Sequence, residues 1–290
     1  MKKYLTMTLL GSNGRTGNIL FQLNLLLYIS EKYDYQILLT TEQNKMIKTF
    51  CLLDFEPIKN VKFIDYNENE EFGDPKLDKL LETNKLNLNI NGYFQSFKYL
   101  DHKYLKTMFN FDKYIYLDQQ LLKYNSVLVG IHIRLGDYIT EYKYIFNSII
   151  HWKIDPSIII KNIMNIYKQK FTNVKFLVFS DDIKLCQQKL NIEELEYNNL
   201  NNNACTDLFM LSKCNHFILT NSTFGYWSYL LNIINTNKIE NTYCFFPDKF
   251  FLDNSRYSKF NNKIIQSYFR KNMNVFLLSL IHISEPTRRS

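Results

Sequence analysis

Short apolar runs alternate along the chain with longer segments in which apolar residues recur every three or four positions. The short runs predict strands and the longer segments predict helices. Alternation of this kind is typical of a parallel sheet covered by helices, so we expect the α/β fold class. In the first half, strands are expected at 4–10, 35–40, 61–65 and 86–93, and helices at 19–32 and 97–109.

The second half repeats the alternation. Strands are expected at 126–133, 174–179, 215–219 and 243–246, and helices at 155–170, 207–213 and 226–232, with Thr206 as the N-cap of the middle helix. We therefore predict two α/β domains, residues 1–124 and 125–275. Residues 276–290 begin apolar and end polar with no glycine turn signal between the two parts, and we expect them to be a tail outside the fold.

Three polar segments of the second half directly follow predicted strands: 134–138, 180–182 and 221–223. The carboxyl ends of parallel strands meet at one edge of a sheet, and ligands of open α/β sheets bind there. The strand before the first segment is apolar on both faces, which suits a strand buried under helices. We therefore expect the three segments to line one binding site.

His132 and Arg134 are alternate residues at the end of that apolar strand, so their side chains are expected on the same face. The guanidinium is always charged, and its planar fork matches a phosphate or a carboxylate. The sequence thus indicates an anion site at this strand end. The alternative is structural: Arg134 pairs with Asp137, and His132 is a buried core histidine.

A glycine-rich turn at residues 11–18 joins the first predicted strand to the first predicted helix. This arrangement directs backbone N–H groups and a helix N-terminus at an anion. The glycine spacing matches neither the dinucleotide-binding nor the Walker loop. The alternative is an ordinary turn in which glycine supplies a positive φ.

The chain has 290 residues, a formal net charge of +7 and 46% hydrophobic residues. Its basic residues are scattered among acidic ones, which suits an anionic small-molecule ligand or a loose attraction to a membrane surface. No basic stripe and no nucleic-acid-binding motif is present, so we expect no nucleic-acid partner.

The five cysteines form no pattern with metal-ligand spacing, and their number is odd. We expect reduced thiols and a cytoplasmic protein. The sequence shows no hydrophobic region of a signal peptide and no run of about 20 apolar residues that would span a membrane. A peripheral position at a membrane is the alternative to a purely cytoplasmic one.

Several segments resemble, in order, the motifs of the α1,2-fucosyltransferases of glycosyltransferase family 11. They are Gly14–Gln22, Gly92–Ser96, Gly130–Tyr138, Phe179–Asp182, and Asp207–Ser212 with Asn221–Phe224 and Trp227. The third resembles the HxRRxD-type motif that α1,6- and protein O-fucosyltransferases share. Three positions depart from the family pattern: Leu135 replaces a second arginine, Ile19 a glutamine and Tyr226 a tryptophan.

This resemblance implies a GT-B-type fold with two Rossmann-like domains that face a cleft, the first on the acceptor side and the second binding the sugar nucleotide. It implies GDP-fucose as the donor substrate, no required metal and no other cofactor. A glycan or oligosaccharide would be the acceptor, with inversion to an α-linked product. The resemblance names the 2-hydroxyl of a galactoside as the acceptor group.

The resemblance also implies roles for single residues. Arg134 would hold the diphosphate, His132 would line the donor site, and Asp207 would accept hydrogen bonds from guanine. Asp137 is the nearest acid; the favoured role is to orient Arg134, and the alternative is a general base. Two further groups belong to the predicted site: Asn221, Ser222 and Thr223 at the phosphate, and Gly14, Gly17 and Asn18 at the donor sugar or acceptor.

Two other functions remain open. The pair Asp181-Asp182 could bind the cation of a metal-dependent glycosyltransferase, although such pairs often cap the following helix. The chain could also be a carbohydrate-binding relative without catalysis. Sensitivity to a chelator would identify the first function, and sugar binding without nucleotide binding would identify the second.

Overall fold

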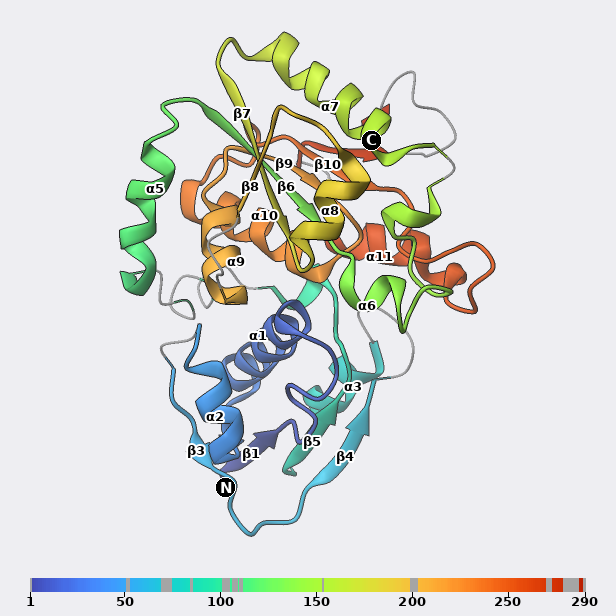
Figure 1. Ribbon diagram of the computed structural model, residues 1–290. Helices are drawn as coiled ribbons and strands as arrows, with labels where there is room; N and C mark the ends of the chain where they lie inside the picture. Colours follow the sequence, from blue (N-terminus) through green and yellow to red (C-terminus); the bar gives the residue numbers. More distant parts are fainter. Residues whose placement is uncertain are drawn as a thin grey trace. The chain divides into compact units, whose positions relative to one another are not determined.

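The computed structural model describes residues 2–50, 53–68, 75–83, 86–100, 105, 109, 112–152, 154–198, 203–269, 273–278 and 287–288. The chain divides into two compact units, residues 1–112 and 113–290 (Figure 1). Each unit contains a sheet of mainly parallel strands with helices, which confirms the predicted α/β class. The acceptor and donor roles expected for the two domains stay predictions.

The sheet of the first unit has the strand order β3-β2-β1-β5-β4, and all its neighbours pair in parallel. Its strands are β1 (Lys3–Thr6), β2 (Tyr35–Leu39), β3 (Glu56–Pro57), β4 (Ile64–Asn67) and β5 (Leu88–Asn91). Its helices are α1 (Thr16–Tyr33), α2 (Thr41–Ile47) and α3 (Pro75–Thr83).

The predicted helix at 97–109 starts instead with the short 3₁₀ helix η1 (Phe97–Tyr99), and Leu105, described further along, is helical. Ser96 caps this turn, because its side chain accepts a hydrogen bond from the backbone N–H of Lys98 at 3.2 Å. Leu100 then has extended backbone angles, so the turn ends there. Most of the remaining predicted helix lies outside the described residues.

The sheet of the second unit has the order β12-β11-β10-β9-β6-β7-β8, with only the β11–β12 pair antiparallel. Its strands are β6 (Val127–Ile133), β7 (Val174–Ser180), β8 (Leu195–Tyr197), β9 (His216–Leu219), β10 (Cys244–Pro247), β11 (Val275–Leu278) and β12 (Thr287–Arg288). Its helices are α5 (Asp118–Leu122), α6 (Gly136–Ile139), α7 (Pro156–Lys170), α8 (Ile183–Leu190), α9 (Ala204–Ser212), α10 (Thr223–Thr236) and α11 (Asn261–Tyr268), with 3₁₀ turns η2 (Asp112–Leu117), η3 (Ile149–His151) and η4 (Ser258–Phe260).

Helices cover both faces of β6. Val129, Ile131 and Ile133 belong to the apolar cluster that includes residues of α7 and α8. The intervening positions face α9 and α10: a Cβ at Gly130 would lie 2.5 Å from Leu211. This alternation explains why β6 is apolar on both faces, and it directs His132 to the α10 side.

The structure differs from the sequence analysis at the start of α9 and in the last part of the second unit's sheet. Helix α9 begins at Ala204, because the side chain of Asn203 caps it by accepting hydrogen bonds from the N–H groups of Cys205 and Thr206. The assignment of Thr206 as the N-cap was therefore wrong. At the end of the sheet, 276–278 lie in β11 beside β10, where a tail was expected, since apolar residues extend the parallel sheet there.

Among the described residues, no helix combines the length and the hydropathy that a membrane-spanning helix needs.

Candidate active site

Arg134 directly follows β6, an interior strand of the second unit's sheet between β9 and β7, and is held between two carboxylates. Its Nη2 lies 2.7 Å from Oδ1 of Asp137, and its Nη1 lies 2.9 Å from Oδ2 of Asp181. The three side chains are 14%, 14% and 18% exposed. Ion pairs that are this shielded from solvent hold a guanidinium more firmly than pairs at an open surface.

The backbone around Arg134 is fixed as well. Its N–H donates to Oγ1 of Thr220 at 3.1 Å, and the N–H of Leu135 donates to Oδ1 of Asp181 at 2.8 Å. A Cβ at Gly136 would lie 2.2 Å from Oδ2 of Asp181, the oxygen that pairs with Arg134. A glycine is therefore required at 136 for Asp181 to reach the guanidinium.

The structure brings the three predicted polar segments together at the carboxyl ends of β6, β7 and β9. Asp181, at the end of β7, joins the first segment through Arg134 and Leu135. The hydroxyl of Tyr138 donates to the backbone carbonyl of Asn221 at 3.0 Å, which joins the first segment to the third. The result is one connected polar cluster, which we call the Arg134 cluster: Arg134, Asp137, Tyr138, Asp181, Thr220 and Asn221.

Asp182 caps the next helix instead of extending the Arg134 cluster. Its Oδ1 accepts a hydrogen bond from the N–H of Leu185 at 3.0 Å, in the first turn of α8. This is the capping role that the sequence analysis weighed against cation binding. Among the described residues, no group of three or more His, Cys, Asp or Glu side chains has a geometry suited to a metal ion.

His132 lies on β6 beneath the start of α10. Its side chain is 4% exposed, and its ring stacks on Phe224 with centroids 5.1 Å apart. Burial, with a smaller contribution from the charge of Arg134, lowers the pKa of His132 to about 3. The imidazole is therefore neutral near pH 7, and within the described part of the chain its buried Nδ1 has no hydrogen-bond partner.

Helix α10 starts beside the Arg134 cluster. Ser222 is its N-cap, with Oγ accepting from the N–H of Phe224 at 3.2 Å, and Thr223 is its first residue. Asn221 is fully buried, and its Nδ2 donates to the carbonyl of Phe250 at 2.7 Å. The N-terminus of a 14-residue helix next to an arginine is an arrangement that attracts anions.

Asp207 lies in the first turn of α9. Its Oδ1 accepts a hydrogen bond from Nδ2 of Asn198 at 2.7 Å, and Asn198 directly follows β8. The side chain is half-buried. The carboxylate thus has a fixed orientation at the β8 side of the sheet, while the Arg134 cluster lies at β6, β7 and β9.

In the first unit, hydrogen bonds join the motif at 14–22 to the motif at 92–96. Oδ1 of Asn18 accepts a hydrogen bond from Nε2 of Gln95 at 2.9 Å, and Nε2 of Gln22 donates to the carbonyl of Gly92 at 2.8 Å. Gly14 has a φ of +91°, and a Cβ there would lie 1.9 Å from Nδ2 of Asn18. The turn thus uses glycine for a positive φ, as the alternative interpretation expected. Gly17 is buried in the first turn of α1.

Some residues that build the cluster were missed by the sequence analysis. Thr220 anchors the Arg134 backbone, and the carbonyl of Phe250 holds Asn221. Thr220 could have been found, because a hydroxyl at the end of a predicted strand lies at the same sheet edge as Arg134. The Phe250 contact involves only a backbone atom, so no residue type signals it.

Comparisons with known proteins give one family and several relatives. The family described as "Glycosyl transferase family 11" matches residues 1–264. "Galactoside 2-alpha-L-fucosyltransferase Sec1" of Mus musculus is 26% identical over 107 residues, 36% of this chain and 28% of that protein. "O-antigen biosynthesis glycosyltransferase WbnK" of Escherichia coli is 30% identical over 149 residues, 50% of this chain and 45% of that one.

A third relative is "Alpha-1,2-colitosyltransferase" of Escherichia coli, 30% identical over 104 residues, 34% of each chain. The matched region thus spans less than half the length of each of these relatives. Among solved structures, POFUT1 in complex with GDP-fucose has a TM-score of 0.51 and 11% identity, covering 80% of this chain and 94% of that chain. At this identity the likeness concerns the fold, and it confirms the GT-B type that the sequence analysis expected.

Proposed function

Since the chain belongs to glycosyl transferase family 11, we propose that it transfers L-fucose from GDP-fucose to a sugar hydroxyl, with inversion and without a required metal. The proposed acceptor group is the 2-hydroxyl of a galactoside. The names of the mouse relative and of the POFUT1 complex support the donor and the acceptor. The observation that carries the proposal is Arg134, held at the end of β6 beside the start of α10.

The proposed chemistry needs a fixed positive charge at the leaving group. As the bond between fucose C1 and GDP breaks, negative charge grows on the β-phosphate. A guanidinium that Asp137 and Asp181 already hold in place can stabilise that charge more in the transition state than in the ground state. Arg134 has five N–H donors, so N–H groups remain for a phosphate after one contact to each carboxylate. In this proposal Arg134 takes the place of a divalent cation.

The start of α10 would bind the same diphosphate. Its first turn presents backbone N–H groups, and the hydroxyls of Ser222 and Thr223 add two possible donors. The Oγ of Ser222 accepts from Phe224, and this bond leaves its proton available. His132, neutral and buried under α10, would line the donor site as an uncharged group.

The remaining assignments are extensions of this proposal. Asp207 would accept hydrogen bonds from the N–H groups of guanine, with Asn198 holding the carboxylate in place. In the first unit, Asn18 and the turn with Gly14 and Gly17 would face the donor sugar or the acceptor. Asp137 would orient Arg134, since its Oδ1 is 2.7 Å from the guanidinium.

The test is a transfer assay in EDTA with GDP-fucose and a β-galactoside acceptor. We expect a fucosylated product by mass spectrometry, and a loss of about 10²-fold or more in turnover for Arg134→Ala. Arg134→Lys is the matched control, because it keeps the charge and loses the planar fork; we expect it to recover part of the activity. Near-normal turnover in Arg134→Ala, with an unchanged circular dichroism spectrum, would remove the phosphate role.

The donor sugar needs a separate comparison, since one relative is named for colitose rather than fucose. The same assay run with a nucleotide that carries colitose distinguishes the two sugars. Faster transfer of fucose supports the proposal, and faster transfer of colitose contradicts it.

A further inference from the structure

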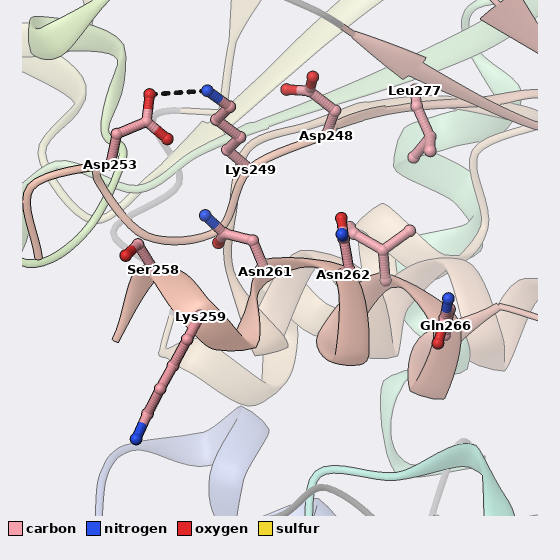
Figure 2. Close-up of a pocket in the computed structure, with 10 residues that line it drawn as sticks. Asp248, Lys249, Asp253, Ser258, Lys259, Asn261, Asn262, Gln266 and Leu277 are labelled. Atoms are coloured by element: carbon pink, nitrogen blue, oxygen red, sulfur yellow. Dashed lines mark hydrogen bonds and ion pairs between the residues drawn. The ribbon is translucent and has the colours of Figure 1, made fainter. Parts of the chain in front are cut away.

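A pocket of about 510 Å³, lined mostly by polar and charged residues, lies in the second unit near the ends of β10 and β11 (Figure 2). Figure 2 shows Asp248 and Leu277, from these two strand ends, across from Asn262 and Gln266 on α11. None of the residues assigned above to the donor site lines this pocket. Its lining is Asp248, Lys249, Asp253, Ser258, Lys259, Asn261, Asn262, Ile265, Gln266 and Leu277.

The pocket opens at the same sheet edge as the Arg134 cluster. β6, β9, β10 and β11 pair in parallel, so their carboxyl ends lie along one edge. Hydrogen bonds connect the two places: Nδ2 of Asn221 donates to the carbonyl of Phe250 at 2.7 Å, and the N–H of Phe250 donates to Oδ1 of Asn261 at 2.9 Å. A ligand in the pocket would therefore be close, along this edge, to a donor substrate at Arg134.

One wall of the pocket is firmly held. Asn261 binds the 250–251 segment with its whole carboxamide, because Oδ1 accepts from the N–H groups of Phe250 and Phe251 and Nδ2 donates to the carbonyl of Phe251. Asn147 donates to the carbonyl of Lys249 at 3.2 Å from the other side. The loop after β10 is thus a preformed wall.

The lining suits an uncharged, hydroxyl-rich ligand. Two aspartates and two lysines balance in formal charge, and Lys249 pairs with Asp253 at 2.7 Å. The carboxamides of Asn262 and Gln266, four positions apart on α11, share one face of the helix and can each donate and accept hydrogen bonds. None of the described lining residues is aromatic, so they offer a nucleotide base no ring on which to stack. Ile265 and Leu277 offer a small apolar surface for C–H groups.

We propose that this pocket binds a neutral sugar unit of the acceptor glycan, beyond the unit that receives the fucose. The proposal rests on the proposed transferase function, and it adds a reason for the chain to prefer an oligosaccharide over a single sugar. Asn262 and Gln266 make the proposed contacts, because both side chains are exposed on α11.

The test uses the full chain with the double substitution Asn262→Leu and Gln266→Leu. The matched control is Asn165→Leu with Gln169→Leu, the same pair of residue types four positions apart and exposed on α7. The probes are methyl β-galactoside and the tetrasaccharide lacto-N-neotetraose. Binding of each probe is measured by saturation-transfer NMR titration, GDP binding by calorimetry, and KM in the transfer assay.

We expect the α11 variant to weaken tetrasaccharide binding and raise its KM about fivefold to tenfold, as the loss of about one net hydrogen bond would. Binding of methyl β-galactoside, binding of GDP and kcat should not change. The α7 control should match the native chain in every measurement. If the native chain binds no tetrasaccharide, if the α11 variant binds it normally, or if the variant loses GDP binding instead, the pocket proposal is wrong. If GDP does not bind the native chain while the tetrasaccharide effect is present, the transferase proposal fails and the pocket remains a glycan site.

Discussion

Each partner of Arg134 fixes a different part of the residue. Asp137 holds Nη2, Asp181 holds Nη1, and Thr220 holds the backbone N–H. Asp181 also accepts from the N–H of Leu135, so one carboxylate sets both the guanidinium and the turn that follows β6. We therefore regard Asp181 as a positioning residue for Arg134. The sequence analysis considered Asp181 as a possible cation ligand and did not anticipate this contact.

At the residue scale, Gly136→Ala should disturb the site through Asp181 alone. The new Cβ would lie 2.2 Å from the oxygen that pairs with Arg134, so Asp181 must turn away. We expect GDP affinity to fall about tenfold, as the loss of one aligned charge-assisted hydrogen bond would. Calorimetry measures this affinity. Asp181→Asn should reproduce the loss; if Gly136→Ala binds GDP like the native chain, the positioning role is refuted.

His132 and His216, both buried, predict how stability depends on pH. Burial lowers the pKa of His132 to about 3 and that of His216 to about 4, aided by the charges of Arg134 and Lys170 respectively. At pH values between these two pKa values and the pKa of about 6.5 in the unfolded chain, the unfolded chain binds more protons than the folded chain. The free energy of unfolding therefore falls as the pH drops through this range. By pH 5 each histidine should cost about 2 kcal/mol of unfolding free energy.

Urea unfolding at pH 7 and pH 5 checks this expectation. His132→Gln should lose about 2 kcal/mol less than the native chain over this interval, because the contribution of His132 is removed. An equal loss in both proteins would show that His132 titrates normally in the folded state.

At the scale of elements, the segment after β10 belongs to the sheet of the second unit. Phe276 of β11 stacks on Phe245 of β10 with ring centroids 5.0 Å apart, and on Tyr243 at 6.1 Å. These contacts join β11 to the same apolar cluster that α7 covers. An isolated tail would have no such contacts.

Phe276→Ala should therefore lower the free energy of unfolding by about 2 kcal/mol, less than the 3–5 kcal/mol of a fully buried phenylalanine, because the ring is only half-buried. Chemical denaturation measures the change. Tyr144→Ala is the control, since that ring is 71% exposed and its loss should have little effect. Unchanged stability in Phe276→Ala would mean that β11 contributes nothing to the fold.

Patterns within one element were predictable from the sequence, and contacts between elements were not. The helix at 155–170 was predicted from its proline and apolar spacing, and α7 confirms it at Pro156–Lys170. The N-cap of α9 was misplaced, because Asn203 and Thr206 both have capping side chains and only the turn geometry selects between them. Strand β8, three residues long, is too short for an apolar alternation to identify it.

The same limit applies to the site. Apart from Thr220, the residues of the Arg134 cluster lie in segments that the sequence analysis selected by their positions after strands, and the structure brings Arg134, Asp137, Asp181 and Asn221 together. Arg134 and Asp181 are 47 positions apart in the sequence (181 − 134). Their ion pair depends on β6 and β7 being neighbours in the sheet. A sequence pattern shows neither this adjacency nor the space that Gly136 leaves.

At the scale of the whole molecule, each unit assembles its own set of motifs. In the first unit, the 14–22 and 92–96 segments join through Asn18 with Gln95 and Gln22 with Gly92. In the second unit, three strand ends join around Arg134. The family match from residue 1 to 264 covers the first unit and most of the second.

The most direct test of the central claim is a calorimetric titration of the full chain with GDP in EDTA, with UDP as the control. The roles proposed for Arg134 at the diphosphate and for Asp207 at guanine predict GDP binding without any divalent ion and at least about tenfold weaker binding of UDP. Arg134→Ala should remove binding of both nucleotides. GDP binding that requires restored Mg²⁺ or Mn²⁺, or no GDP binding at all, would contradict the account.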